Sequence, residues 1–198
     1  MENYQNMTKV SNEKKFTVYE LTSYALMAAL ICIFAPMSVP IGPIPVSLTN
    51  LILYFAIFII GTRGTMISYI VYLLIGIVGL PVFSGYSGGL AKIAGPTGGY
   101  LLGFIPMILI MGFSYKYFRC KDSKTEIIIT MIGMIAGTFI AYVFGTIWFI
   151  LQMECEWGYA LSVCVIPFIP FDLLKMVIAN IIGRKVRKPL LIQGLIQD

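Results

Sequence analysis

Apolar residues run through almost the whole chain, in six stretches separated by prolines, glycines and charged residues. Charged residues make up only 12% of the 198 residues, too few to cover the surface of a water-soluble domain of this size. A helix needs about 20 apolar residues to span the hydrocarbon core of a bilayer. The sequence therefore predicts an all-α, polytopic membrane protein. We expect six transmembrane helices at about 18–35, 47–60, 65–80, 99–118, 126–151 and 160–182.

The six stretches follow one another closely, so residues 1–198 are expected to form a single six-helix membrane domain. Residues 1–17 are a polar tail, and the loops at about 36–46, 81–98 and 152–159 would lie on the external side. The second and third stretches are short for a span, so we expect them to extend into their loops, tilt, or sit partly inside the bundle.

The distribution of basic residues predicts the orientation in the plasma membrane. Twelve of the fourteen basic residues would lie on one side, whereas the opposite loops carry only Lys92 together with Glu154 and Glu156. Because Lys and Arg are enriched in cytoplasmic loops, both termini are predicted to be cytoplasmic. The twelve residues are Lys9, Lys14, Lys15, Arg63, Lys116, Arg119, Lys121, Lys124, Arg184, Lys185, Arg187 and Lys188.

The absence of histidine excludes several kinds of chemistry. The chain has no imidazole base for a Ser-His-Asp triad and no His metal ligand, and its four cysteines lack CxxC spacing. We therefore expect no catalytic residues, no metal and no cofactor. No nucleotide-binding motif is present, so any ATP that drives transport would be used by a partner. The excess of positive charge is explained by the bilayer, and no nucleic-acid partner is expected.

Two external loops have an unusual composition. Residues 36–46 carry four prolines and no charge, and residues 81–98 are rich in glycine. Backbone fixed by proline and tight turns allowed by glycine are typical of ordered segments that fold back onto a bundle. Such a loop is either a lid over a binding site or a turn-rich connector, and functional sites favour the first interpretation.

The pair Asp172 and Lys175 is the most informative feature of the sequence. They lie three residues apart in the sixth stretch and share one helix face. An ionisable side chain inside a membrane is costly unless it is paired or faces water, and such residues usually mark substrate pathways. The two charges could simply neutralise each other beside Pro167 and Pro170. We favour the alternative, in which they face a polar cavity and bind a ligand.

The glycine-rich run Gly95-Pro96-Thr97-Gly98-Gly99 precedes the fourth stretch. Backbone N–H groups at such a helix start can bind an anion, so Gly95, Thr97 and Gly98 are candidate ligand contacts. The run lacks the GK[ST] ending of a P-loop. It is equally compatible with a simple turn into the helix.

Small and aromatic residues add less specific candidates. Ala25 and Ala29 have the spacing that lets helices approach closely, and Ala28 extends this patch, which could pack inside the bundle or against another subunit. Tyr142 and Trp148 lie in the outer half of the fifth stretch. Each is either an interface or core aromatic or part of the wall of an apolar pocket.

Three runs of the sequence resemble the BioY family, the substrate-binding S components of energy-coupling factor (ECF) biotin transporters. They are PIGPIPVSLTN at 40–50, GLPVFSGYSGGLAKIAGPTGGYLLGF at 79–104 and PFIPFDLLKMVIAN at 167–180. The resemblance covers residues 20–185 in order, and the GPTGGYLLGF block and the P-x-D-x-x-K block are specific when they occur together.

The resemblance implies six helices with cytoplasmic termini and a biotin pocket near the external face, closed by the first and third external-side loops. It implies that Asp172 and Lys175 recognise biotin, and that the GPTGG loop falls on residues 95–99. Partners would be a transmembrane coupling subunit, thought to meet the patch at Ala25, Ala28 and Ala29, and two ATPase subunits. Biotin would be the transported ligand and not a cofactor.

The sequence departs from the family pattern at the start of the second stretch. Thr49 stands where many relatives carry Gln, and Ser47 stands where Thr is usual. If that Gln touches the ligand in relatives, the contact is changed here or Asn50 replaces it. Lys92, just before the GPTGG loop, either attracts the biotin carboxylate or is solvated.

Chemistry of the ligand suggests roles for the remaining candidates. Asp172 could accept from a ureido N–H, and Lys175 could donate to the ureido oxygen or to the carboxylate. Apolar side chains would cover the ring system, and we expect these to be Phe83, Tyr86, Tyr142 and Trp148. Alternatives are an S component for another small vitamin, a non-enzymatic scaffolding subunit and, least favoured, an intramembrane enzyme.

Overall fold

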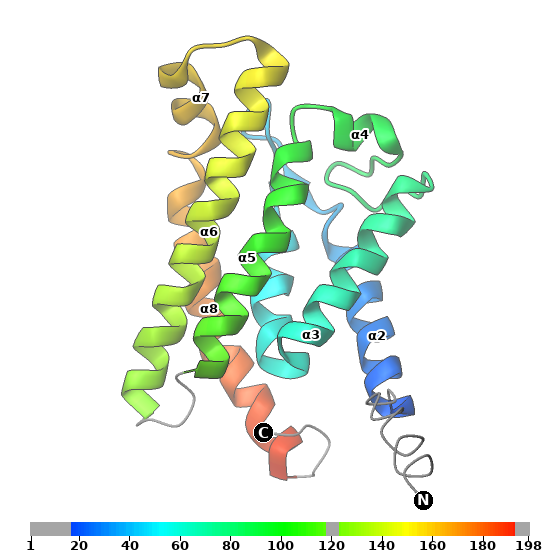
Figure 1. Ribbon diagram of the computed structural model, residues 1–198, viewed down its shortest axis with the longest axis vertical. Coiled ribbons are helices and arrows are strands. Elements are labelled where there is room, and N and C mark those ends of the chain that lie inside the picture. Colours follow the sequence, from blue (N-terminus) through cyan, green and yellow to red (C-terminus); the bar gives the residue numbers. More distant parts are fainter. Residues whose placement is uncertain (1–16, 118–122, 193–198) are drawn as a thin grey trace, which may run out of the picture.

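A computed structural model describes residues 17–117 and 123–192 of the chain. Long helices lie side by side, with α4 and α7 at one end of the bundle and the start of α2 and the end of α8 at the other (Figure 1). In chain order the elements are α2 (Val18–Phe34), β1 (Ser38–Val39), β2 (Val46–Ser47), α3 (Thr49–Ile77), α4 (Leu90–Ala94), α5 (Gly98–Tyr117), α6 (Ser123–Met153), α7 (Trp157–Cys164) and α8 (Phe168–Ile192).

Among the described residues, four helical segments are long and apolar enough to cross a membrane. They are Thr49–Ile77, Gly98–Tyr117, Thr125–Met153 and Trp157–Arg187, and the last contains both α7 and most of α8. The helix α2 is apolar but shorter, with 17 residues. Large apolar side chains such as Phe139 and Leu151 on α6 are well exposed, as expected of surfaces that face lipid. The prediction of a helical membrane protein is confirmed.

The second and third predicted stretches form the two arms of α3, which meet at Gly61. This glycine has φ of +67° and ψ of −177°, a conformation that side-chain-bearing residues rarely adopt. The helix changes direction there, so the two arms run beside each other in opposite senses (Figure 1). The predicted break between residues 60 and 65 is therefore a sharp bend at one residue.

The sixth predicted stretch, at 160–182, is not one helix, and this prediction is corrected. α7 ends at Cys164, and α8 begins at Phe168 after a turn. The cause is Pro167, because a proline disfavours helical backbone at the residue before it and lacks an N–H of its own. Pro170 lies in the first turn of α8, where its missing N–H costs no helical hydrogen bond.

The proline-rich loop at 36–46 and the glycine-rich loop at 81–98 are ordered and packed on the bundle, as their composition predicted. In the first loop β1 and β2 form an antiparallel hairpin, which the all-α prediction missed, with Ser38 opposite Ser47. The second loop contains α4 and is joined to its surroundings through the backbone. The Gly85 N–H donates to the Pro36 carbonyl at 3.1 Å, and the Gly89 N–H donates to the Gly76 carbonyl at 2.7 Å.

Gly76 also shows why this loop lies so close to the helix. A Cβ at this position would collide with the ring of Phe83, so the glycine allows the second loop to pack directly on α3. Phe83 is completely buried there, edge-on to Tyr72 at 5.5 Å between ring centroids. The structure therefore makes Phe83 a core residue that anchors the loop.

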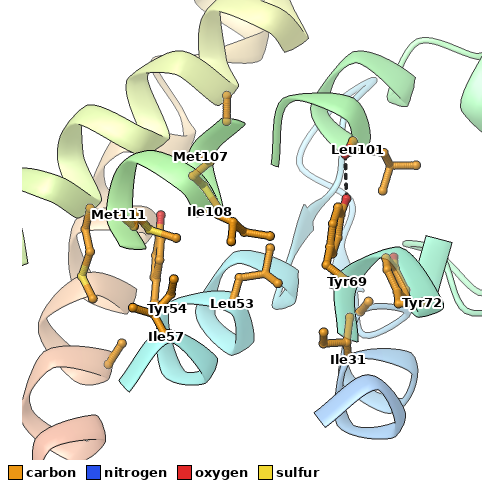
Figure 2. Packing of buried hydrophobic residues seen from close by; sticks show 14 of the residues in the cluster. Ile31, Leu53, Tyr54, Ile57, Tyr69, Tyr72, Leu101, Met107, Ile108 and Met111 are labelled. Atoms are coloured by element: carbon orange, nitrogen blue, oxygen red, sulfur yellow. Dashed lines mark hydrogen bonds between the residues drawn. The ribbon is translucent and has the colours of Figure 1, made fainter. Parts of the chain in front are cut away.

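The core between α3 and α5 consists of interlocking apolar side chains. Leu53 and Ile57 from the first arm of α3 face Met107 and Ile108 of α5 (Figure 2). In a bilayer such contacts stabilise a bundle through close packing, because lipid tails are as apolar as the side chains. Tyr69 adds a polar tie, since its hydroxyl donates to the Leu101 carbonyl at 2.7 Å (Figure 2).

Arg187 secures the end of the bundle opposite the loops. Its Nη1 donates to the Phe58 carbonyl at 2.9 Å, and its guanidinium lies 5.1 Å from the centre of the Tyr115 ring. The bend at Gly61 interrupts the helical hydrogen bonds nearby, so a carbonyl that precedes the bend needs a donor from elsewhere. Arg187 thus joins α8 to both α3 and α5.

We expect the substitution Arg187→Met to destabilise the protein by about 2 kcal/mol, because it leaves the Phe58 carbonyl without this donor and removes the contact with Tyr115. Thermal unfolding of the purified protein in detergent measures the effect. The matched control is Lys185→Met, since Lys185 lies on the same helix but is exposed. Equal melting temperatures for the two variants would contradict this role of Arg187.

Candidate functional site

The pair Asp172 and Lys175 lies in the first two turns of α8. Pro167 sets the start of this helix, so both side chains project from the loop-bearing end of the bundle toward its interior. They are 4% and 7% exposed, and Lys175 Nζ lies 3.0 Å from Asp172 Oδ1. The prediction that they share one helix face is confirmed, and the two charges also pair with each other.

Lys175 uses all three of its N–H donors within the protein. Besides Asp172 Oδ1, Nζ donates to the Ser47 carbonyl at 2.8 Å and to Asn50 Oδ1 at 3.0 Å. An ammonium has three donors and no acceptor, so this cation is saturated. Burial of the charge is thereby compensated by one opposite charge and two polar oxygens.

Asp172 has neutral donors on both of its oxygens. Asn50 Nδ2 donates to Oδ1 at 2.7 Å, and the Tyr142 hydroxyl donates to Oδ2 at 2.7 Å. Asn50, Tyr142, Asp172 and Lys175 together form what we call the polar network. Its net charge is zero, and its members come from the first turn of α3, the middle of α6 and the start of α8.

A pocket opens beside the polar network, at the end of the bundle that carries the loops. Its polar lining comprises Ser47, Thr49, Asn50, Tyr72, Ser84, Thr97, Thr138, Tyr142, Asp172 and Lys175. Its apolar lining comprises Ile44, Pro45, Tyr100, Leu101, Phe104, Ala141 and Phe168. A concave site that is largely apolar with a few convergent polar groups is typical of a small-molecule binding site.

The glycine-rich loop at 95–99 holds three of the predicted ligand contacts, and only one of them borders the pocket. Thr97 lines the pocket, whereas Gly98 is buried at the first position of α5 and does not reach it. Trp148 Nε1 donates to the Gly95 carbonyl at 2.9 Å. Gly95 and Trp148 therefore hold the loop against α6, and neither lines the pocket.

Three of the predicted ligand contacts lie elsewhere. Phe83 belongs to the core, as described above, although the adjacent Ser84 does line the pocket. Tyr86 is 70% exposed, at a tight turn where its φ is +54°. Lys92 lies on α4, where partial burial lowers the pKa of its ammonium, and it does not reach the pocket.

Several lining residues were missed by the sequence analysis. Tyr72, Thr138 and Phe168 carry no charge, and hydroxyl-bearing and aromatic residues are common inside membrane helices, so no local signal distinguishes them. Asn50 was considered only as a substitute for a family Gln. An amide inside an apolar stretch needs a partner, and this signal could have placed Asn50 beside Asp172.

The alanine patch of α2 is divided between two faces. Ala25 and Ala29 are exposed, whereas Ala28 is 3% exposed and points into the bundle. Of the two alternatives left open for this patch, Ala28 therefore packs inside the bundle, because residues 25 and 29 lie one above the other on a helix and residue 28 is rotated inward.

The chain matches biotin transporters along most of its length. The sequence model of the BioY family matches residues 7–191. A protein named biotin transporter BioY2, from Lactococcus lactis subsp. cremoris, is 33% identical over 166 residues, which cover 84% of this chain and 88% of the relative. The biotin transporter BioY from Thermotoga maritima is 32% identical over 170 residues, which cover 85% of this chain and 96% of the relative.

A solved structure agrees with these relatives. It is the crystal structure, at 2.1 Å, of the S-component for biotin from an ECF-type ABC transporter. The likeness has a TM-score of 0.74 at 31% sequence identity, and it covers 90% of this chain and 95% of that chain. The matches share sequence, length and fold, and the chain belongs to the BioY family.

Proposed function

We propose that this protein binds biotin in the pocket beside Asp172 and Lys175 and acts as the S component of an ECF-type vitamin uptake transporter. The observation that carries the proposal is the electrically neutral polar network, buried at the edge of a mostly apolar pocket. The names of the BioY relatives and of the solved S-component support biotin as the ligand. Binding and release require no bond to break, so the chain is not an enzyme.

The chemistry of biotin suits both the polar and the apolar lining of the pocket. Its ureido group has two N–H donors and one carbonyl acceptor. Asp172 Oδ2 accepts one hydrogen bond, from Tyr142, and a carboxylate oxygen can accept a second, from a ureido N–H. The rings of Tyr100, Phe104 and Phe168 offer apolar area to the fused rings of biotin.

We expect Asp172→Asn and Lys175→Met to weaken biotin binding by 100-fold or more, which corresponds to about 3 kcal/mol. Each substitution removes one charge of the pair and leaves the other buried without compensation. Isothermal titration of biotin into the purified protein in detergent, without ATP, measures the change. The matched controls are Glu154→Gln and Lys116→Met, because both residues are exposed and neither lines the pocket.

The same titration separates the alternatives. Tight binding of another vitamin with no binding of biotin would identify an S component of different specificity. Absence of any small-molecule ligand would favour a scaffolding subunit. Mass spectrometry of biotin recovered after incubation would reveal any chemical change and thereby an enzyme. Unchanged affinity in both Asp172→Asn and Lys175→Met would leave the pair a purely structural role.

The orientation that we propose has six spans, the two arms of α3 included, and both termini in the cytoplasm. The loops that cover the pocket, with Glu154 and Glu156, lie at one end of the bundle, while Arg63 and Lys116 lie at the bend of α3 and the end of α5. This charge distribution supports an external pocket, since basic residues favour the cytoplasmic side. Five of the twelve basic residues on which the prediction rests, Lys9, Lys14, Lys15, Arg119 and Lys121, lie outside the described residues.

Labelling of single cysteines tests this orientation. In a chain whose native cysteines are replaced by serine, Glu156→Cys should react with a membrane-impermeant maleimide in intact cells. Lys116→Cys should react only after permeabilisation, because it would face the cytoplasm. Both side chains are exposed, so access from the two sides of the membrane is the main difference between them. The reverse pattern would place the pocket on the cytoplasmic side.

The partners that we propose are an ECF transmembrane coupling subunit and two ATPase subunits, with the lipid bilayer around the bundle. Ala25 and Ala29 expose a small-residue face of α2 that another helix could approach closely. The chain itself offers no P-loop, so ATP would be hydrolysed by the partners.

Bulky substitutions on α2 should separate assembly from binding. We expect the double variant Ala25→Trp and Ala29→Trp to lose most co-purification with the coupling subunit while it binds biotin normally, since both residues are exposed and neither lines the pocket. Ala136→Trp is the control, because Ala136 is an exposed alanine on α6. Normal assembly of the α2 variant, or equal loss in the control, would rule out this face as the docking surface.

A further inference from the structure

The hydroxyl of Tyr72 is a polar group without a partner in the binding pocket. Tyr72 lies on the second arm of α3, its side chain is completely buried, and it lines the pocket. No hydrogen bond of good geometry reaches this hydroxyl, and the Thr49 hydroxyl beside it already accepts from Ser47 Oγ at 3.0 Å. Burial of an unpaired hydroxyl costs free energy that a phenylalanine would avoid. The tyrosine is therefore explained better by a ligand than by packing.

Tyr69, one turn earlier on the same helix, is a tyrosine whose hydroxyl is hydrogen-bonded within the protein. It is equally buried, and the two rings lie 5.6 Å apart. Its hydroxyl donates to the Leu101 carbonyl at 2.7 Å (Figure 2). The same environment thus satisfies one tyrosine from within the protein and leaves the other with a free donor at the pocket.

Thr97 adds a second free donor to the same pocket. Its Oγ1 is buried without a hydrogen-bond partner and lies just before the first residue of α5. The N-terminus of a 20-residue helix carries partial positive charge, which favours an anionic group nearby. The pocket-lining Ser84 supplies a further hydroxyl from the second loop, and none of these elements brings a carboxylate to the pocket.

The polar network that lines the same pocket is unsuited to an anion. Every N–H of Lys175 is already donated within the protein, and the charge of Asp172 cancels that of Lys175. The remaining capacity of Asp172 is a lone pair, which accepts from an N–H and repels a carboxylate. Two of the three helices that carry this network, α6 and α8, lie on one side of α5 in Figure 1, and the second arm of α3 lies on the other. Asn50, the remaining member, lies on the first arm of α3.

We propose that the hydroxyls of Tyr72 and Thr97 form a second ligand subsite that donates hydrogen bonds to the acidic end of the ligand, while Asp172 accepts from its N–H end. This inference rests on the proposed function, because it assumes a ligand that carries both an N–H group and a carboxylate, as biotin does. It assigns a direction to the bound ligand, with the carboxylate toward the second arm of α3 and the start of α5.

The test compares biotin with biotinol, in which an alcohol replaces the carboxylate. Tyr72→Phe and Thr97→Val should each raise the Kd of biotin about tenfold, and should change the Kd of biotinol by less than about threefold. The melting temperature of ligand-free Tyr72→Phe should equal or exceed that of the unsubstituted protein, since the variant loses an unpaired buried hydroxyl. Isothermal titration and thermal unfolding on the full chain in detergent give both values.

Tyr69→Phe is the matched control, because the same atom is removed from a neighbouring, equally buried ring. It should lower the melting temperature of the ligand-free protein and leave biotin affinity within about threefold. Wild-type affinity for biotin in both Tyr72→Phe and Thr97→Val would overturn the subsite. An equal loss for biotin and biotinol would also overturn it, because the hydroxyls would then not meet the carboxylate. Failure of the unsubstituted protein to bind biotin would instead refute the proposed function itself.

Discussion

The ion pair between Asp172 and Lys175 imposes the strictest requirement on this fold. Two charges buried in a bundle that lies in lipid are tolerated only when each is paired and hydrogen-bonded. Their partners come from two regions far apart in the chain. The Ser47 carbonyl at the end of β2 and Asn50 in the first turn of α3 belong to one region, and Tyr142 on α6 belongs to the other. Satisfying the pair therefore fixes how the first loop, α3 and α6 meet α8, and this junction is where the pocket lies.

α8 also forms a hydrogen bond with α3 near its other end. Lys175 donates to the Ser47 carbonyl, just before α3, and Arg187 donates to the Phe58 carbonyl, just before the bend at Gly61. The two cations are twelve residues apart on α8, about 18 Å along a helix. α8 thus binds the first arm of α3 near both of its ends. One contact belongs to the binding site and the other to the stability of the bundle, so substitutions at the two cations should have separable effects.

Much of this arrangement could be predicted from the sequence because it depends on features that stand out in an apolar chain. The six stretches, the pairing of Asp172 with Lys175 and the packing of the loops follow from hydropathy, helical spacing and proline and glycine content.

Other features depend on contacts between distant residues. Phe83 and Tyr86 look alike in sequence, yet one fills the space above Gly76 and the other is exposed. Ala28 differs from Ala29 only in its rotation about the helix axis. The unpaired hydroxyl of Tyr72 could not be predicted from its sequence neighbours, because Tyr69 lies three residues earlier in the same apolar stretch and its hydroxyl is hydrogen-bonded.

In the proposed binding mode, Asp172 accepts a hydrogen bond from an N–H of the ligand. Solid-state NMR can measure this contact directly, as the dephasing between aspartate ¹³Cγ in the protein and ¹⁵N in the ureido group of bound biotin. A hydrogen bond places these nuclei within about 4 Å of each other. The chain has only three aspartates, and Asp172→Asn identifies the signal. We predict strong dephasing that disappears in this variant. Bound biotin without such dephasing, or with its carboxylate carbon beside Lys175 instead, would contradict the account.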